Sequence, residues 1–222
     1  MESLAKQYSK LSYEEKQALF IYKSGMGELL NDLDNELLLQ KKYNDYLDKF
    51  SYNFIIKHTY FSLVDMTSIE SFKESLIYVK QIIDEVSTKL VTNQNLKLFR
   101  LITSNKEITD ISKGNIISTT TSPAEVIKYE LEGLDSNIHK LDELNIAIYE
   151  IDLPAGSHVC CVPGRFKYKS ELYFIDDSSG VNEEEIILNK DIYDIDVIKS
   201  HDNDGVKYIK CMAIDKYGRT RK

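Results

Sequence analysis

Three consecutive carboxylates, Glu183, Glu184 and Glu185, directly precede the aliphatic run 186–188. If Glu185 begins a strand, Glu183 and Glu185 project to the same face, because side chains alternate along a strand. Like charges held close together repel each other, so two carboxylates on one face come at a cost. In such a pair, one carboxylate can act as a general acid or base while the other stabilises positive charge. An exposed acidic turn is the other interpretation that this segment allows when it is taken alone.

Arg100 lies in the middle of the apolar segment 96–103. A charge at such a position is costly unless it is paired or faces a cleft. In a cleft, a guanidinium suits a phosphate, because its planar fork donates two parallel hydrogen bonds. An edge-strand arginine that points to water is the alternative.

Hydroxyl side chains follow an apolar stretch at 118–122. Ser118 and Thr120 share one side of a strand through this segment. From a strand end, hydroxyls can orient a catalytic carboxylate or a sugar hydroxyl. The alternative is a polar transition from strand to loop.

In chain order, Arg100, residues 118–120 and residues 183–185 resemble the signature of the bacterial ADP-ribosyltransferase exotoxins. That family carries an arginine, then Ser-Thr-Ser, then Glu-x-Glu, and its arginine-specific class is the one that this chain resembles. The aliphatic run after Glu185 sets the register, so that Glu185 matches the second Glu of the signature. Thr120 stands where the family has its second serine, and it keeps the hydroxyl.

Segment 11–25 is similar to the helix that opens many domains of this family, and the likeness extends over roughly residues 8–214. It implies a single catalytic domain over 1–222. Residues 1–95 would be its mainly helical part, and residues 96–214 a β core with the NAD site.

The resemblance implies a mono-ADP-ribosyltransferase that moves ADP-ribose from NAD+ to an arginine of a target protein and releases nicotinamide. Arg100 would bind a phosphate of NAD+, and Ser118 would orient Glu185. Glu185 would bond the nicotinamide ribose hydroxyl and stabilise the oxocarbenium-like transition state, as carboxylates do in glycoside chemistry. NAD+ is thus expected as a substrate, and no metal is expected.

Glu183 would activate or position the incoming guanidine. The Rho-directed exoenzymes of this family, which modify asparagine, typically carry Gln there, so Glu183 favours arginine. Thr120 and Tyr129 complete the expected NAD+ site, Tyr129 with Lys128 standing in for an aromatic residue and an arginine of the family. An NAD+ glycohydrolase, or a catalytically inactive binding module of the same fold, remains an alternative.

The segment 163–182 is longer than the substrate-recognition turn of the family. Rigid aromatic side chains are good contact residues, so we expect an enlarged target-recognition loop here. An extra hairpin that packs its aromatic side chains locally is the alternative. The candidate recognition residues are Phe166, Tyr168, Tyr173 and Phe174.

Local patterns predict an α+β fold, with N-terminal helices followed by a mostly antiparallel β core. A capping box at Ser12 and Glu15 opens a helix to residue 22, and Gly25 and Gly27 are expected to interrupt it. A second amphipathic run follows through Leu29, Leu30, Leu33 and Leu37, and an apolar stripe from residue 72 to 90 predicts the clearest helix. The resemblance adds two sheets that enclose an NAD cleft. The predicted strands are 96–103, 115–121, 145–152, 157–162, 185–189 and 206–214, with turns at 154–156 and 202–205.

The net charge of −8 argues against a nucleic-acid partner, which calls for a clustered basic face. No run is long and apolar enough to cross a bilayer, and the first ten residues lack the apolar stretch of a signal peptide. The expected partner is a target-cell protein with an exposed arginine, and a separate delivery component is possible. We therefore expect a bacterial or phage product that is secreted or delivered into a target cell's cytoplasm.

Overall fold

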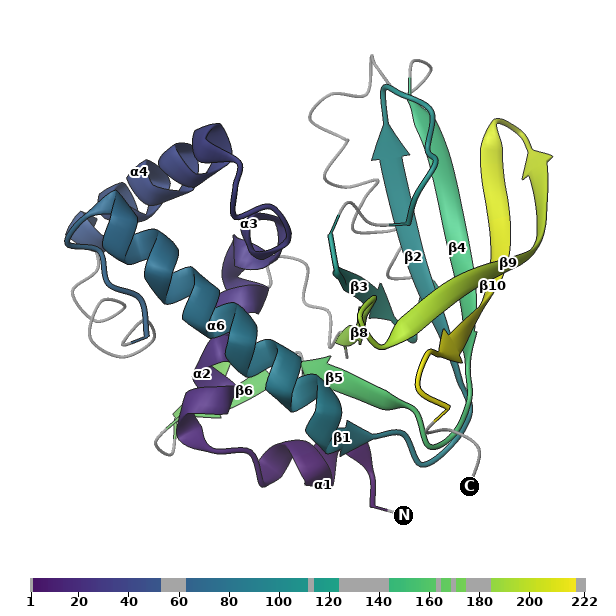
Figure 1. Ribbon diagram of the computed structural model, residues 1–222, viewed down its shortest axis with the longest axis horizontal. Helices are drawn as coiled ribbons and strands as arrows, with labels where there is room; N and C mark the ends of the chain where they lie inside the picture. The colour runs from purple at the N-terminus through teal and green to yellow at the C-terminus, as the bar shows by residue number, and fades with distance from the viewer. Residues whose placement is uncertain are drawn as a thin grey trace.

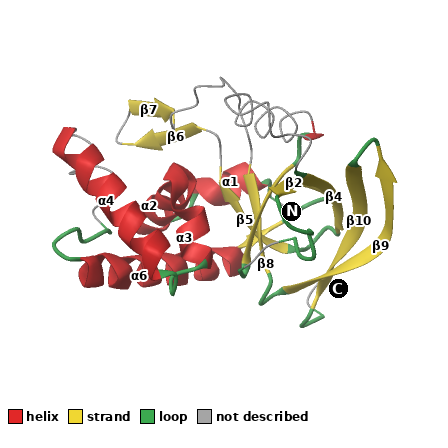
Figure 2. Cartoon of the chain, turned by 90° about the horizontal axis from the view of Figure 1, so that it is seen from above, coloured by secondary structure: helices red, strands yellow, loops and turns green. Residues whose placement is uncertain are grey.

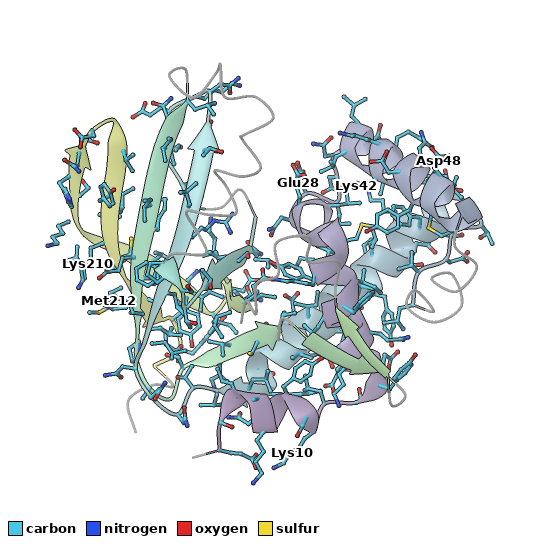
Figure 3. All side chains as sticks on the ribbon, turned by 180° about the vertical axis from the view of Figure 1, so that it is seen from behind. Lys10, Glu28, Lys42, Asp48, Lys210 and Met212 are labelled. Atoms are coloured by element: carbon cyan, nitrogen blue, oxygen red, sulfur yellow. The ribbon has the colours of Figure 1, made fainter. Side chains whose placement is uncertain are left out.

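The protein is described by a computed structural model that covers residues 2–52, 63–111, 114–123, 144–162, 165–168, 171–174 and 185–218. For 165–168 and 171–174 the description covers the backbone alone. Helices occupy the first part of the described chain and strands follow from residue 90, which confirms the predicted α+β order (Figure 1). Charged residues such as Lys10, Glu28 and Asp48 lie at its periphery (Figure 3).

The capping box predicted at Ser12 and Glu15 opens the second helix, with both of its reciprocal hydrogen bonds present. Gly25 and Gly27 do not interrupt the helical path, contrary to the prediction. The chain passes from that helix through a π-helical turn into another short helix, because Gly27 takes an ordinary right-handed conformation. The described helices are α1 (Leu4–Ser9), α2 (Tyr13–Ile21), the π-helix η1 (Tyr22–Met26), α3 (Gly27–Asn31), α4 (Glu36–Tyr52) and α6 (Ile69–Lys89).

Helix α6 buries the predicted apolar stripe. It begins at the N-cap Ser68, whose hydroxyl accepts a hydrogen bond from the Ser71 backbone N–H. Phe72, Leu76, Val79 and Ile83 are fully buried at steps of four, three and four. This stripe packs on the sheet and joins the helical part to it (Figure 2).

The described strands confirm all six predicted segments and add four more. Eight of them pair in the order β1-β5-β8-β3-β2-β4-β10-β9, and β6 pairs with β7. Their neighbours are antiparallel except for β4 and β10, which run parallel. The strands are β1 (Leu90–Val91), β2 (Leu96–Ser104), β3 (Ile116–Thr120), β4 (Asn145–Leu153), β5 (His158–Val162), β6 (Arg165–Tyr168), β7 (Glu171–Phe174), β8 (Glu185–Asn189), β9 (Tyr193–Asn203) and β10 (Val206–Asp215).

At the centre of the eight-stranded sheet, two neighbouring strands are joined by very few residue pairs; we call this place the joint. Strands β2 and β3 share a single registered pair, Phe99 with Thr120, whereas β2 and β4 pair along their whole length. The joint separates the half β1-β5-β8-β3, which lies against the helices, from the half β2-β4-β10-β9 (Figures 1 and 2). The family resemblance implies two sheets, whereas the structure pairs these eight strands in one continuous order.

Both predicted turns are present. Gly156 has φ of 83° in the turn between β4 and β5, and Asp204 and Gly205 have φ of 50° and 79° between β9 and β10. Two consecutive residues with positive φ match the right-handed twist of a two-residue hairpin. The hairpin partner β9 was not predicted, because its apolar alternation is confined to Tyr193, Ile195 and Val197, and the strand is exposed from Asp196 onward.

Candidate active site

Glu185 is the first residue of β8 and sits between two neighbouring strands. It pairs with Thr120 of β3 and with Val162 of β5. The residue is 5% exposed. A carboxylate this deeply buried requires hydrogen-bond partners, because the loss of its hydration is otherwise uncompensated.

Three side chains donate hydrogen bonds to Glu185. The Ser118 hydroxyl donates to Oε1, as predicted from the resemblance. The Tyr22 hydroxyl donates to the same oxygen at 3.0 Å. The Lys23 ammonium lies 3.0 Å from Oε2 and forms an ion pair with it. The carboxylate is thereby held between the sheet and the helical part of the chain.

Tyr22 remains a hydrogen-bond donor through the physiological pH range. Burial raises the pKa of its hydroxyl well above the ordinary value, and the neighbouring Glu185 carboxylate raises it further. A neutral phenol can therefore donate steadily to the carboxylate.

Arg100 joins this cluster through Ser118. Its Nη1 donates to the Ser118 carbonyl oxygen at 2.7 Å, while the Ser118 hydroxyl faces Glu185. The edge-strand alternative for Arg100 is wrong, because β2 lies between β3 and β4 and the side chain is partly buried. Arg100, Lys23 and Glu185 together carry a net charge of +1, from two cations and one carboxylate.

Contacts outside this cluster hold its strands in place. The Asn31 side chain at the end of α3 donates to the Ile116 carbonyl at 2.9 Å and accepts from the Ile116 N–H at 2.8 Å. The Thr119 hydroxyl donates to the Ile186 carbonyl at 2.5 Å, which links β3 to β8. At the far end of β8, Asn189 donates to Asp84 of α6 at 2.9 Å. Both strands of the site are thus fastened to helices.

The remaining predicted site residues are placed differently. Thr120 is 2% exposed, and its hydroxyl accepts a hydrogen bond from the Ser122 N–H at 3.2 Å. Glu183 and Tyr129 lie outside the described residues. In the recognition segment, β6 and β7 form an antiparallel hairpin that pairs Phe166 with Tyr173. The backbone of Tyr168 and Phe174 belongs to the same hairpin, and its side chains lie outside the description.

Tyr22 and Lys23 are the functional candidates that the sequence did not single out. They lie 163 and 162 residues from Glu185 along the chain. Both lie in segment 11–25, but no local pattern connects these side chains to a carboxylate on a distant strand.

Two cavities lie elsewhere on the β2-β4-β10-β9 half. One of about 340 Å³ includes Phe99, Tyr208 and His201 in its lining, and the last two rings stack with centroids 5.3 Å apart. Phe99 pairs with Thr120, the strand neighbour of Glu185, but the described lining contains no residue of the cluster itself. Its flat side chains suit a planar ring.

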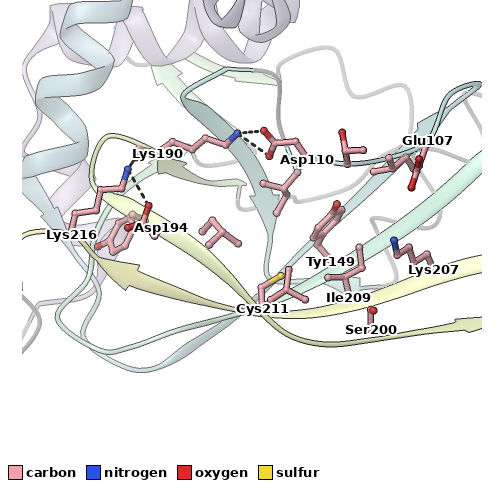
Figure 4. Close-up of a pocket in the computed structure, with 16 residues that line it drawn as sticks. Glu107, Asp110, Tyr149, Lys190, Asp194, Ser200, Lys207, Ile209, Cys211 and Lys216 are labelled. Carbon is pink, nitrogen blue, oxygen red and sulfur yellow. Dashed lines mark hydrogen bonds and ion pairs between the residues drawn. The ribbon is translucent and has the colours of Figure 1, made fainter.

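The other cavity, of about 470 Å³, is lined from β4, β9, β10 and the segment after β2 (Figure 4). Its floor includes Tyr149, Ile209 and Cys211. At its edge Lys190 bonds Asp110 and Lys216 pairs with Asp194, so these charges are matched. The described lining contains neither Arg100, Ser118 nor Glu185.

Neither a metal cluster nor a membrane span is found in the described part of the chain. No group of three or more His, Cys, Asp or Glu side chains there could hold a metal ion. None of the helices in those ranges is long and apolar enough to cross a membrane. All three cysteines are free and buried on strands.

Comparison with known proteins finds similarity at the level of solved structures. No model of a protein family matches the sequence, and no curated protein matches it. Bacterial ADP-ribosyltransferases, several of them toxins, are among the solved structures that match. An ADP-ribosyltransferase from Clostridium botulinum is 16% identical, with 94% of this chain and 91% of that chain covered and a TM-score of 0.49.

Two further toxins match over a similar extent. Vis toxin from Vibrio splendidus is 13% identical, with 97% of this chain and 80% of that chain covered and a TM-score of 0.47. An ADP-ribosyltransferase toxin from Paenibacillus larvae is 15% identical, with 96% and 92% covered and a TM-score of 0.45. At such distances the activity of this chain has to be inferred from its own side chains.

Proposed function

We propose that this protein transfers ADP-ribose from NAD+ to an arginine side chain of a target protein. The observation that carries the proposal is the buried Glu185 carboxylate, which accepts hydrogen bonds from Ser118, Tyr22 and Lys23. A carboxylate held by hydrogen-bond donors suits a sugar that becomes cationic during the reaction. Arg100, which is bonded to the same serine, suits the anionic diphosphate of that substrate.

In the proposed reaction the bond between C1′ of the ribose and the nicotinamide nitrogen breaks. Nicotinamide leaves with the bonding electron pair, and its ring becomes neutral. Glu185 stabilises the positive charge that develops on the sugar and accepts a hydrogen bond from a ribose hydroxyl. A guanidine nitrogen then bonds to C1′ and loses a proton. Arg100 binds the diphosphate, for which a planar guanidinium is well suited.

The preference for arginine rests on Glu183. A second carboxylate would attract a guanidinium and take up its proton, and the sequence places Glu183 two residues before Glu185. The β6–β7 hairpin is proposed to recognise the target protein, because its segment supplies the aromatic residues Phe166, Tyr168, Tyr173 and Phe174.

Purified protein incubated with NAD+ labelled in its ADP-ribose part, with and without a target-cell lysate, tests this function. We expect label on a discrete protein band, with the modified arginine located by mass spectrometry. Glu185→Gln and Glu183→Gln should abolish the band, and Glu185→Gln should slow nicotinamide release by at least about a hundredfold. Glu28→Gln, at an exposed position, is the matched control. Deletion of 166–178 should remove the band and spare nicotinamide release.

Other outcomes of this assay separate the alternatives. Nicotinamide release without a labelled band would replace the transferase by an NAD+ glycohydrolase. An absence of NAD+ turnover and of NAD+ binding by the wild type would indicate an inactive module and would contradict the site assignment.

A further inference from the structure

We propose that Lys23 is a substrate-binding residue that exchanges partners, holding Glu185 in the free protein and the diphosphate of the dinucleotide in the complex. This inference rests on the proposed function, because it takes NAD+ as the substrate. It starts from the ion pair between the Lys23 ammonium and Glu185 Oε2 at 3.0 Å.

The first step concerns which oxygen of Glu185 receives the sugar. Oε1 already accepts hydrogen bonds from Ser118 and Tyr22, and an ionised carboxylate oxygen has roughly two lone-pair sites. Among the described side chains, Oε2 accepts only from Lys23. Oε2 is therefore the oxygen that accepts a hydrogen bond from a ribose hydroxyl. In the free protein the same oxygen forms the ion pair with the Lys23 ammonium.

The second step concerns charge. A lysine ammonium beside the carboxylate cancels its negative charge and repels the positive charge that develops on the ribose. Glu185 can stabilise an oxocarbenium-like sugar fully only when this ammonium has moved to another anion. The diphosphate is attached to the same ribose, so the substrate itself brings that anion into reach of the lysine.

The third step concerns mobility. Lys23 lies at the start of η1, where its side chain is 18% exposed, whereas the Glu185 side chain is 7% exposed. The lysine side chain is thus the more exposed partner of the pair. Its flexible four-carbon stem and three donors allow it to move from a carboxylate to a phosphate oxygen. Arg100, already fixed on Ser118, does not need to move.

Calorimetric binding of ADP and of adenosine separates the two roles of Lys23, because only ADP carries a diphosphate. We expect Lys23→Met to weaken ADP binding by about tenfold, the loss typical of a charge-assisted hydrogen bond, and to leave adenosine binding unchanged. Lys23→Arg should restore most of the ADP affinity. Lys73→Met, which removes a positive charge from the surface of α6, should bind ADP like the wild type.

Kinetics of nicotinamide release provide the second readout. Lys23→Met should raise KM for NAD+ without lowering kcat, because the lost contact belongs to substrate binding. Unchanged ADP affinity, or a lowered kcat with unchanged KM, would overturn the exchange of partners and leave Lys23 as a residue that only positions Glu185. Failure of the wild type to bind ADP would overturn it as well. If the wild type binds ADP through Lys23 but does not cleave NAD+, the proposed function fails and the anion contact stands.

Discussion

The hydrogen bonds of Glu185 are unequally distributed between its two oxygens. Oε1 receives two neutral hydroxyls from opposite sides, Ser118 from the sheet and Tyr22 from the helical part. These fix the orientation of the carboxylate without changing its charge. Oε2 receives the ammonium of Lys23, which does change the charge balance. Tyr22 therefore positions the carboxylate, and Lys23 determines the charge balance around it.

Tyr22→Phe removes one of the two donors to Oε1 and preserves the ring. A hydrogen bond to a charged group contributes about 1.5–3 kcal/mol, so we expect kcat for NAD+ cleavage to fall by about tenfold to a hundredfold. Tyr78→Phe is the control, since its exposed hydroxyl donates to Glu14 on the surface. Steady-state kinetics with thermal unfolding of each variant make the test. Wild-type kcat in a folded Tyr22→Phe protein would remove Tyr22 from the site.

At the scale of elements, the close succession of α2, η1 and α3 delivers Tyr22, Lys23 and Asn31 to one side of the sheet. Tyr22 and Lys23 begin η1 and reach β8, while Asn31 ends α3 and clamps β3 through both backbone groups of Ile116. Gly27, which lies between Lys23 and Asn31 in the chain, leaves room for the Tyr22 ring. A Cβ at this position would lie 2.9 Å from Cε2 of Tyr22.

Gly27→Ala tests this dependence. An alanine raises the helix propensity of α3 by about 1 kcal/mol, which by itself would stabilise the protein. We expect no such gain, because the new methyl group has to displace the Tyr22 ring and with it the hydrogen bond to Glu185. NAD+ cleavage should fall about tenfold, while Glu28→Ala, at the exposed neighbouring position, should retain full activity. A Gly27→Ala protein that is both more stable and fully active would show that the ring moves at no cost.

At the scale of the whole molecule, several groups that ionise only in alkaline solution are buried where the helices meet the sheet. Burial raises the pKa of the Cys160 thiol well above its ordinary value, and neighbouring Cys161 and Glu185 raise it further. Burial also raises the pKa of Tyr22 and of Tyr8. On β10, burial raises the pKa of Cys211 to about 11.

The direction of the resulting pH dependence follows from these shifts. Each group is neutral in the folded protein at a pH where it already ionises in the unfolded chain. The folded state binds more protons there, so its stability is complete below the unfolded pKa values and is lost as pH rises. The loss should begin near pH 8.5–9 for cysteine and increase near pH 10 for tyrosine, at up to about 1.4 kcal/mol per pH unit for each group.

Urea unfolding at intervals between pH 7 and pH 10.5 measures this dependence. We expect a constant midpoint up to about pH 8 and a falling midpoint above it. Cys160→Ala should be less stable at pH 7 and should show a shallower fall between pH 9 and pH 10. A midpoint that stays constant to pH 10.5 would contradict the burial of these groups.

Much of this fold could be predicted from the sequence because its signals lie within a few residues of one another. The capping box at Ser12 and Glu15, the stripe along α6 and the hairpin turn at 202–205 all depend on local spacing, and the structure confirms each of them. The pairing of Ser118 with Glu185 was expected as well, because the order of the motifs resembles a known signature. For β9 the local signal was too short, since the apolar alternation of this edge strand ends at Val197 and most of its residues are exposed.

The tertiary structure alone decided which side chains complete the site. Tyr22 and Lys23 reach Glu185 across 163 and 162 residues, and such contacts depend on how α2 and η1 pack on the sheet. The sequence suggested that Gly27 breaks a helix, whereas in the structure the helical path continues through Gly27 and its missing side chain leaves room for the Tyr22 ring. Local periodicity determines which face of an element is buried, but the partner that this face meets is determined by the packing of the whole chain.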